Sequence, residues 1–167
     1  MFFEFDYEFD APPRQVWNEL IDWKGHEQWI VSTFVELHGT GDSRAVGATF
    51  TAWSGPLPTT QLGRRLSLQD HMEVAELHYD AATETGVCRV NKLGPTLGGS
   101  AGFTVAPRLA AGTAAPSGGT TLTWTEDVTV ALVPNLLTPM LRRIGIIGFR
   151  FSFGRLARHL RKSSLAG

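Results

Sequence analysis

The strongest constraint on the fold is an alternation near the start of the chain. Residues 2–10 read FFEFDYEFD, in which acidic side chains alternate with aromatic ones. The aromatic members are Phe3, Phe5, Tyr7 and Phe9. A period of two predicts a β-strand with one acidic face and one aromatic face. Because four large rings on one side of a strand need a core or a cavity to receive them, we expect them to point inward and the acids to face water.

Length and composition predict one domain, residues 1–167, with a single core, because the 167 residues are 43% hydrophobic. Cys88 is the only cysteine, which excludes an intramolecular disulfide, and we expect it to be a small buried residue. No histidines have the spacing of metal ligands, so we expect no metal and no cofactor. No secretory signal is visible, and the longest uncharged apolar-rich run, residues 128–141, is too short to span a bilayer. The sequence therefore predicts a soluble cytoplasmic protein.

Charge is divided unevenly along the chain. All 16 acidic residues precede residue 128, so residues 1–133 carry a net charge of −8 and residues 134–167 a net charge of +7. Such a basic tail is typical of a solvated helix face that complements an acidic body, or of weak contact with an anionic membrane surface. We expect no nucleic-acid partner, and the oligomeric state, monomer or homodimer, stays open.

The residues after the first strand predict two short helices and then six more strands. APPRQVWNEL has prolines at a helix start and apolar residues at helical spacing, and Asp22 is a candidate cap for a second helix through WKGHEQWI. A period of two then returns in six segments, at residues 31–38, 45–53, 71–79, 86–94, 100–109 and 120–132. The strand at 71–79 has an ambiguous register, because apolar side chains occupy both of its faces.

The rest of the chain consists of loops and one long helix. Residues 54–69 are either a lid or an ill-ordered excursion, and residues 110–119 read as a flexible hairpin loop. A helix is predicted from residue 134 or 139 to residue 163, and its glycines favour a close approach to a sheet. We expect its buried stripe to consist of Leu137, Leu141, Ile144, Gly148 and Phe151, with Ile146, Phe149 and Phe153 off that stripe.

This order of elements predicts an α+β fold. A bent antiparallel sheet of seven strands would wrap around the long C-terminal helix, with two short helices following the first strand. A bent sheet and one helix do not easily fill all the space between them, so a cavity is expected there. The aromatic face of the first strand would point into this space.

The same order of elements, together with APPRQVWNELIDWKGHEQW and the block from DHMEVAELHYD to TLTWTED, resembles the START-like, Bet v 1-like superfamily (SRPBCC). Within it, the chain is most similar to the bacterial polyketide cyclase/dehydrase and lipid-transport group. The resemblance implies a helix-grip fold whose cavity binds hydrophobic molecules such as lipids, sterols or polyketides. Its motifs are informative about fold, and they assign no catalytic residue to this chain.

Two ionisable side chains are predicted to face the apolar interior. Lys92 shares a strand face with Cys88 and Val90, and Glu126 shares one with Trp124. Isolated burial of either charge is costly, so each should pair, reach the cavity mouth or have a shifted pKa. Three interpretations stay open: an anchor for the polar end of a ligand, a general acid and base, or a structural ion pair.

His26 beside Glu27 could likewise be an acid–base pair, but a surface or capping role fits a short helix between aromatic residues better.

The leading hypothesis is a protein that binds a small hydrophobic or amphipathic molecule between the sheet and the C-terminal helix. The alternatives are a polyketide cyclase or aromatase that uses polar cavity residues, and a lipid carrier that docks to membranes through its basic helix. Whether the protein is an enzyme stays open. The predicted ligand-binding residues are Phe3, Phe5, Tyr7, Phe50, Cys88, Val90, Lys92, Phe103, Trp124, Glu126, Leu141, Ile144 and Phe151.

Overall fold

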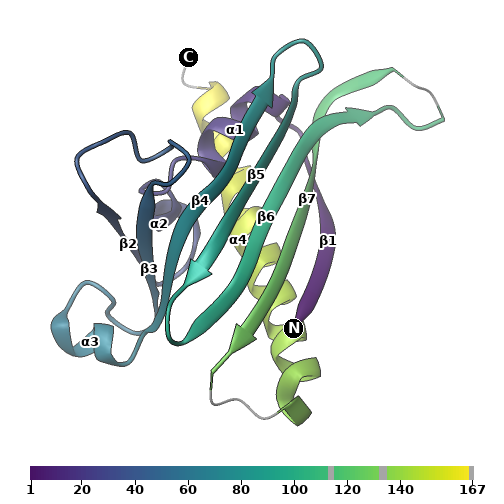
Figure 1. Ribbon diagram of the computed structural model, residues 1–167. Helices are drawn as coiled ribbons and strands as arrows, with labels where there is room; N and C mark the ends of the chain where they lie inside the picture. The colour runs from purple at the N-terminus through teal and green to yellow at the C-terminus, as the bar shows by residue number, and fades with distance from the viewer. Residues whose placement is uncertain (113–114, 132–134, 166–167) are drawn as a thin grey trace.

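The structure is a computed structural model that describes residues 1–112, 115–131 and 135–165. Its centre is a seven-stranded antiparallel sheet in the order β1-β7-β6-β5-β4-β3-β2, so the first strand lies at one edge beside the last (Figure 1). The strands are β1 (Phe2–Phe9), β2 (Thr33–His38), β3 (Thr49–Ser54), β4 (Leu68–Asp80), β5 (Thr85–Leu93), β6 (Leu97–Leu109) and β7 (Pro116–Val130). The predicted seven strands and α+β class are confirmed.

One long helix, α4 (Thr138–Leu165), crosses the sheet behind its strands in Figure 1 and contacts β1. The two short helices predicted after β1 are present as α1 (Pro13–Leu20), which contacts β6 and β7, and α2 (His26–Trp29), which contacts β2 and α4. A 3-10 turn, η1 (Asn135–Leu137), precedes α4. The core lies between the sheet and these three helices, as the helix-grip prediction requires.

The prediction for β1 is confirmed. Phe3, Phe5 and Phe9 are buried and Tyr7 is half-buried, whereas the alternating acids are exposed. On the outer face the hydroxyls of Thr123 and Thr125, in the paired strand β7, donate hydrogen bonds to two of these acids. The acidic face therefore meets water and the aromatic face meets the helix.

The predicted cap of the second helix is wrong. Helix α2 begins at His26 with Gly25 as its N-cap, and Asp22 does not cap it. The reason is a tight turn that places Gly25 against Asp22, because a Cβ atom on Gly25 would lie 2.6 Å from Asp22 Oδ2. This turn carries Trp23 inward, where its ring stacks on Phe50 with centroids 4.6 Å apart.

A bulge resolves the ambiguous register of β4. Its pairing with β5 shifts between Val74 and Glu76, so Ala75 is the extra residue. Before the bulge, Val74 is fully buried, and after it the inward positions pass to Leu77 and Tyr79, which pack against the core. Because of this one inserted residue, the apolar side chains before the bulge and those after it face the same side of the sheet.

The predicted buried stripe of α4 is wrong. The fully buried residues are Phe153, Leu156 and Leu160, while Ile144 and Phe151 are 59% and 58% exposed. Continued by two further turns, the predicted stripe reaches Arg155 and Arg158 instead of apolar residues. The C-terminal half of the helix, where polar and apolar faces separate clearly, therefore sets its rotation.

The segment 54–69 contains a helix, α3 (Gln61–Arg65), that sequence periodicity did not predict. Thr60 caps it, because its hydroxyl oxygen accepts a hydrogen bond from the Gly63 amide at 3.0 Å. Arg64 docks the helix on β2, where it pairs with Glu36 at 3.2 Å and covers the ring of Phe34. The loop predicted at 110–119 is shorter than predicted, because residues 116–119 belong to β7 and only residues 110–115 link β6 to β7; of these, residues 113–114 fall outside the described residues.

Candidate functional site: a cavity between the sheet and helix α4

A cavity of about 420 Å³ lies between the sheet and the N-terminal half of α4. Strands β1 and β3–β7 supply most of its wall, and Trp23, His26 and Ile30 close it from the segment that contains α2. Helix α4 contributes Leu141, Ile144, Gly145 and Phe149. Its surface is mostly apolar side chains, which is the composition of a site for a hydrophobic molecule.

Most of the side chains predicted for the site line this cavity. They are Phe3, Phe50, Cys88, Val90, Lys92, Phe103, Trp124, Glu126, Leu141 and Ile144. Three predicted residues lie outside it. Phe5 and Tyr7 pack against Phe153 instead, with ring centroids 6.1 and 5.6 Å apart, and Phe151 is exposed. The inward face of β1 therefore divides between the cavity, reached by Phe3, and the filled core beyond it.

Three ionisable groups meet in the cavity wall. Lys92 Nζ lies 2.5 Å from Asp70 Oδ2 and 3.5 Å from Glu126 Oε2. The side chains of Lys92 and Glu126 are 4% and 5% exposed, and that of Asp70 is 18% exposed. Three strands position the groups: Asp70 is on β4 and Lys92 on the neighbouring β5, whereas Glu126 is on β7, on the other side of β6. Lys92 and Glu126, the two ionisable groups predicted to face inward, thus form an ion pair, and Asp70 is the third member of the cluster.

Burial governs the protonation of this cluster. It raises the pKa of Glu126 to about 7, because desolvation outweighs the attraction of Lys92 and the negative charge of Asp70 adds to the shift. Burial by itself would lower the pKa of Lys92, but the carboxylates of Glu126 and Asp70 raise it above its usual value. Lys92 is therefore cationic, and Glu126 changes charge near neutral pH.

Asp70 is a site residue that the sequence reasoning missed. A signal for it existed, because Met72 and Val74 face inward and a period of two places Asp70 on the same face. The strand prediction began at residue 71, one residue too late to include it. Asp70, which lies closer to Lys92 than Glu126 does, was therefore left out of the predicted site.

His26 was expected in a surface or capping role; it is not on the outer surface but lines the cavity. Its Nε2 lies 2.8 Å from the carbonyl oxygen of Leu20, and its ring packs between those of Trp23 and Trp29. Burial lowers the pKa of His26 to about 4, so the ring is neutral at pH 7 and donates to that carbonyl. Glu27 pairs with Lys24 instead, so His26 and Glu27 do not act as an acid–base pair.

Cys88 is buried in the cavity wall, as expected. Burial raises the pKa of its thiol to about 12, and the neighbouring Glu76 charge contributes to the shift. The thiolate is the nucleophilic form of cysteine, so this side chain is inert at neutral pH. Cys88 contributes apolar surface to the cavity and no covalent chemistry.

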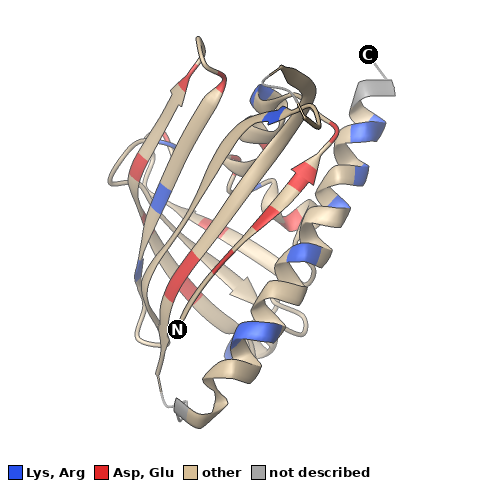
Figure 2. Cartoon of the chain, turned by 90° about the vertical axis from the view of Figure 1, so that its right-hand side faces the viewer, with Lys and Arg blue, Asp and Glu red and all other residues tan. Residues whose placement is uncertain are grey.

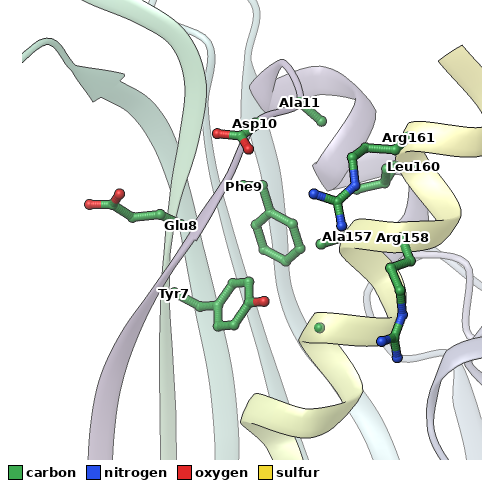
Figure 3. A pocket seen from close by; sticks show the side chains of 10 residues that line it. Tyr7, Glu8, Phe9, Asp10, Ala11, Ala157, Arg158, Leu160 and Arg161 are labelled. Atoms are coloured by element: carbon green, nitrogen blue, oxygen red, sulfur yellow. The ribbon is translucent and has the colours of Figure 1, made fainter.

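A second hollow, of about 640 Å³, lies at the opposite end of α4 (Figure 3). Tyr7 and Phe9 from β1 project toward Ala157 and Leu160 on the helix, and Arg158 lies at its rim. This hollow and the cavity are separated by the side chains that pack around Phe153.

The basic residues of α4 are spaced along its length, and acidic positions lie on the strands beside it (Figure 2). Arg150 and Arg155 donate hydrogen bonds to the main-chain carbonyls of Asp6 and Gln28. No helix among the described residues is both long and apolar enough to cross a bilayer. In the same part of the chain, no group of three His, Cys, Asp or Glu side chains could hold a metal ion.

No family model and no curated protein matches the chain. Solved structures do match. A START superfamily protein from Mycobacterium smegmatis is similar at a TM-score of 0.63 and 14% identity, over 96% of this chain and 97% of that one. The ZhuI aromatase/cyclase from Streptomyces sp. R1128 is similar at a TM-score of 0.60 and 14% identity, over 97% and 94% of the two chains.

A two-domain relative matches in part. The di-domain aromatase/cyclase BexL, from the BE-7585A biosynthetic pathway, is similar at a TM-score of 0.57 and 11% identity. The match covers 96% of this chain, which spans only 46% of that protein. The predicted resemblance to the START-like, Bet v 1-like superfamily is thus confirmed at the level of the fold, which is the helix-grip fold. At these identities the likeness defines the architecture and assigns no activity.

Proposed function

We propose that this protein binds a small hydrophobic or amphipathic molecule in the cavity between the sheet and α4. The observation that carries the proposal is a cavity of about 420 Å³ with a mostly apolar wall and a single cluster of charged side chains. An apolar wall supplies affinity through the hydrophobic effect, and a few placed polar groups orient the ligand. The polar end of the ligand would lie at Asp70, Lys92 and Glu126.

Native mass spectrometry of the protein purified without added ligand tests this proposal. A discrete adduct of a few hundred daltons, released on denaturation, is the expected result. A second measurement uses the neutral dye Nile red, whose fluorescence rises in apolar surroundings. Phe3→Trp narrows the cavity and should weaken dye binding, whereas Phe2→Trp, on the outer face of β1, should leave it unchanged. A protein with no adduct and no dye binding would contradict the proposal.

A second candidate function is enzymatic. Glu126 lies in the cavity wall, and its pKa of about 7 suits a general acid or base at neutral pH. Two proteins with similar folds are named as aromatase/cyclases, which makes a poly-ketone the first substrate class to test. In this role Glu126 would move a proton to or from a carbonyl compound that the apolar wall holds in place.

Separate measurements of turnover and binding decide between the two functions. If the protein is an enzyme, Glu126→Gln should abolish conversion of a poly-ketone while its dissociation constant stays within about threefold. Glu4→Gln, on the outer face of β1, is the matched control and should change neither quantity. Absence of turnover in the unmodified protein, with binding intact, would leave the binding function alone.

A further inference from the structure

Within the described part of the chain, the charged cluster in the cavity wall leaves one carboxylate oxygen without a hydrogen-bond partner. The ammonium group of Lys92 contacts one oxygen each of Asp70 and Glu126. The second oxygen of Asp70, Oδ1, is buried and has no hydrogen-bond partner among the described residues. A buried acceptor without a partner is costly, so a ligand that donates a hydrogen bond there would be stabilised.

Lys92 is not an unpaired cation that could bind an anionic ligand directly. Its side chain is 4% exposed, and two carboxyl groups already surround its ammonium group. A ligand carboxylate or phosphate would have to displace one of them or share the lysine as a third acid. Either arrangement leaves excess negative charge in an apolar wall, where charges are poorly solvated.

The other basic groups at the cavity are few. Burial lowers the pKa of His26 to about 4, so its ring is neutral at pH 7, and it donates to the Leu20 carbonyl. The amino group of Met1 donates to the carbonyl oxygen of Val128. No arginine is present among the described residues that line the cavity. In this described part of the wall, an anionic head group would therefore meet no charged basic side chain other than Lys92, whose ammonium group two carboxyls already surround.

We propose that the cavity selects ligands whose buried polar group is a hydrogen-bond donor without negative charge, such as an alcohol, a phenol or an amine. Asp70 and Glu126 receive that group, and Lys92 holds the two carboxyls in place. Fatty acids and other anionic amphiphiles are disfavoured. This inference rests on the proposed function and specifies the ligand class of the same cavity.

Competition with Nile red at pH 8 tests the inference with three ligands that share one alkyl chain: 1-decanol, decylamine and decanoate. We expect 1-decanol and decylamine to displace the dye at concentrations at least tenfold lower than decanoate. Equal or tighter binding of decanoate would overturn the inference and leave the proposed function standing. A protein that binds neither the dye nor any of the three ligands would instead overturn the proposed function itself.

Variants of the cluster test whether its charge causes the preference. Glu126→Gln should lower the ratio of decylamine to decanoate affinity at least threefold, and Asp70→Asn should act in the same direction. Glu4→Gln removes one carboxylate from the outer face of β1 and should leave the ratio unchanged. Circular dichroism identifies any variant that fails to fold, and either cluster variant then suffices. An unchanged ratio in a folded cluster variant would overturn the inference.

Discussion

Helix α4 lies along the sheet, but its two halves meet the sheet differently. In the C-terminal half, Phe153, Leu156 and Leu160 are at most 1% exposed. In the N-terminal half, Leu141 and Ile144 line a cavity instead. Between β1 and α4, the filled end is thus the packed region around Phe153, and the hollow end is the cavity at the N-terminal half of α4; the second hollow lies beyond the packed region.

The size of the side chains that face the sheet explains much of this difference. Phe153 lies within 6.3 Å, ring centroid to centroid, of Phe5, Tyr7, Phe9, Trp29, Trp124 and Phe149. Two turns earlier the helix presents Gly145 to Phe3, so at that position of the helix no side chain fills the space, and Phe149, one turn further on, contacts the ring. We infer that the filled end supplies the stability that lets the hollow end keep an apolar cavity and buried charges.

The largest expected effect is on the filled end. Phe153→Ala should reduce the free energy of unfolding by about 3–5 kcal/mol, because it opens a void among fully packed rings. Phe149→Ala, one turn earlier, removes a half-buried ring from the cavity wall and should cost about 1–2 kcal/mol. Urea unfolding measures both. Equal losses for the two variants would show that the two ends do not differ in packing.

The next effect concerns the charges of the hollow end. Lys92→Met leaves two carboxyl groups buried without their cation, which should cost about 3 kcal/mol at pH 8. The cost should shrink at pH 5, because Glu126, whose pKa burial raises to about 7, is protonated there and carries no charge that needs the cation. Chemical unfolding at the two pH values checks both statements.

Arg89→Met is the matched control for Lys92→Met on the same strand. Arg89 pairs with Glu76 at 3.3 Å on the exposed side of the sheet, where both side chains are solvated. Its loss should change the stability by less than about 0.5 kcal/mol at either pH. A Lys92 variant that behaved like the Arg89 variant would contradict the burial of the cluster.

The sequence was sufficient to predict the strands and much of the cavity wall, because strand parity is a strict rule. Lys92 and Glu126 were placed inward from their apolar neighbours two residues away, and both line the cavity. The alternation rule failed in two places, one where the strand is irregular and one where the start of the strand was predicted too late. The bulge at Ala75 inserts one residue that no local pattern marks, and Asp70 precedes the strand start that periodicity indicated.

The rotation of α4 was harder to predict for a physical reason. Its N-terminal half has apolar residues on nearly every side, so several stripes look equally suitable for burial. The choice depends on the partner surface, namely the rings of β1 and Trp124, which pack around Phe153. Tertiary packing of this kind is not encoded in the periodicity of the helix alone, and Phe151 was misplaced for that reason.

A smaller expected effect is the pH dependence of stability that the buried Glu126 causes at the hollow end. The pKa of Glu126 is about 7 in the folded protein, above its ordinary value of 4.5. Between pH 4.5 and 7 the folded state therefore holds a proton that the unfolded state has lost, so stability should fall as the pH rises through this window. The fall attributable to Glu126 should reach at most about 3 kcal/mol, since one pKa unit corresponds to about 1.4 kcal/mol.

Glu126→Gln should remove that slope, because an amide does not titrate. The unmodified protein and the variant are compared by urea unfolding at intervals from pH 4.5 to 8. Glu4→Gln, on the outer face of β1, should retain the slope of the unmodified protein. Identical slopes for the Glu126 variant and the unmodified protein would show that this carboxyl does not titrate in the window.

The smallest expected effect separates two glycines of α4 that lie three residues apart. A Cβ atom on Gly148 would meet no atom within 4 Å, so Gly148→Ala should gain about 0.5–1 kcal/mol of stability from helix propensity. A Cβ atom on Gly145 would lie 3.2 Å from Cζ of Phe3, so that ring must shift and the gain should be reduced or lost. Urea midpoints of the two variants measure the difference. Equal gains would mean that the Phe3 ring moves freely into the cavity, and the wall at the hollow end would then be adaptable rather than preformed.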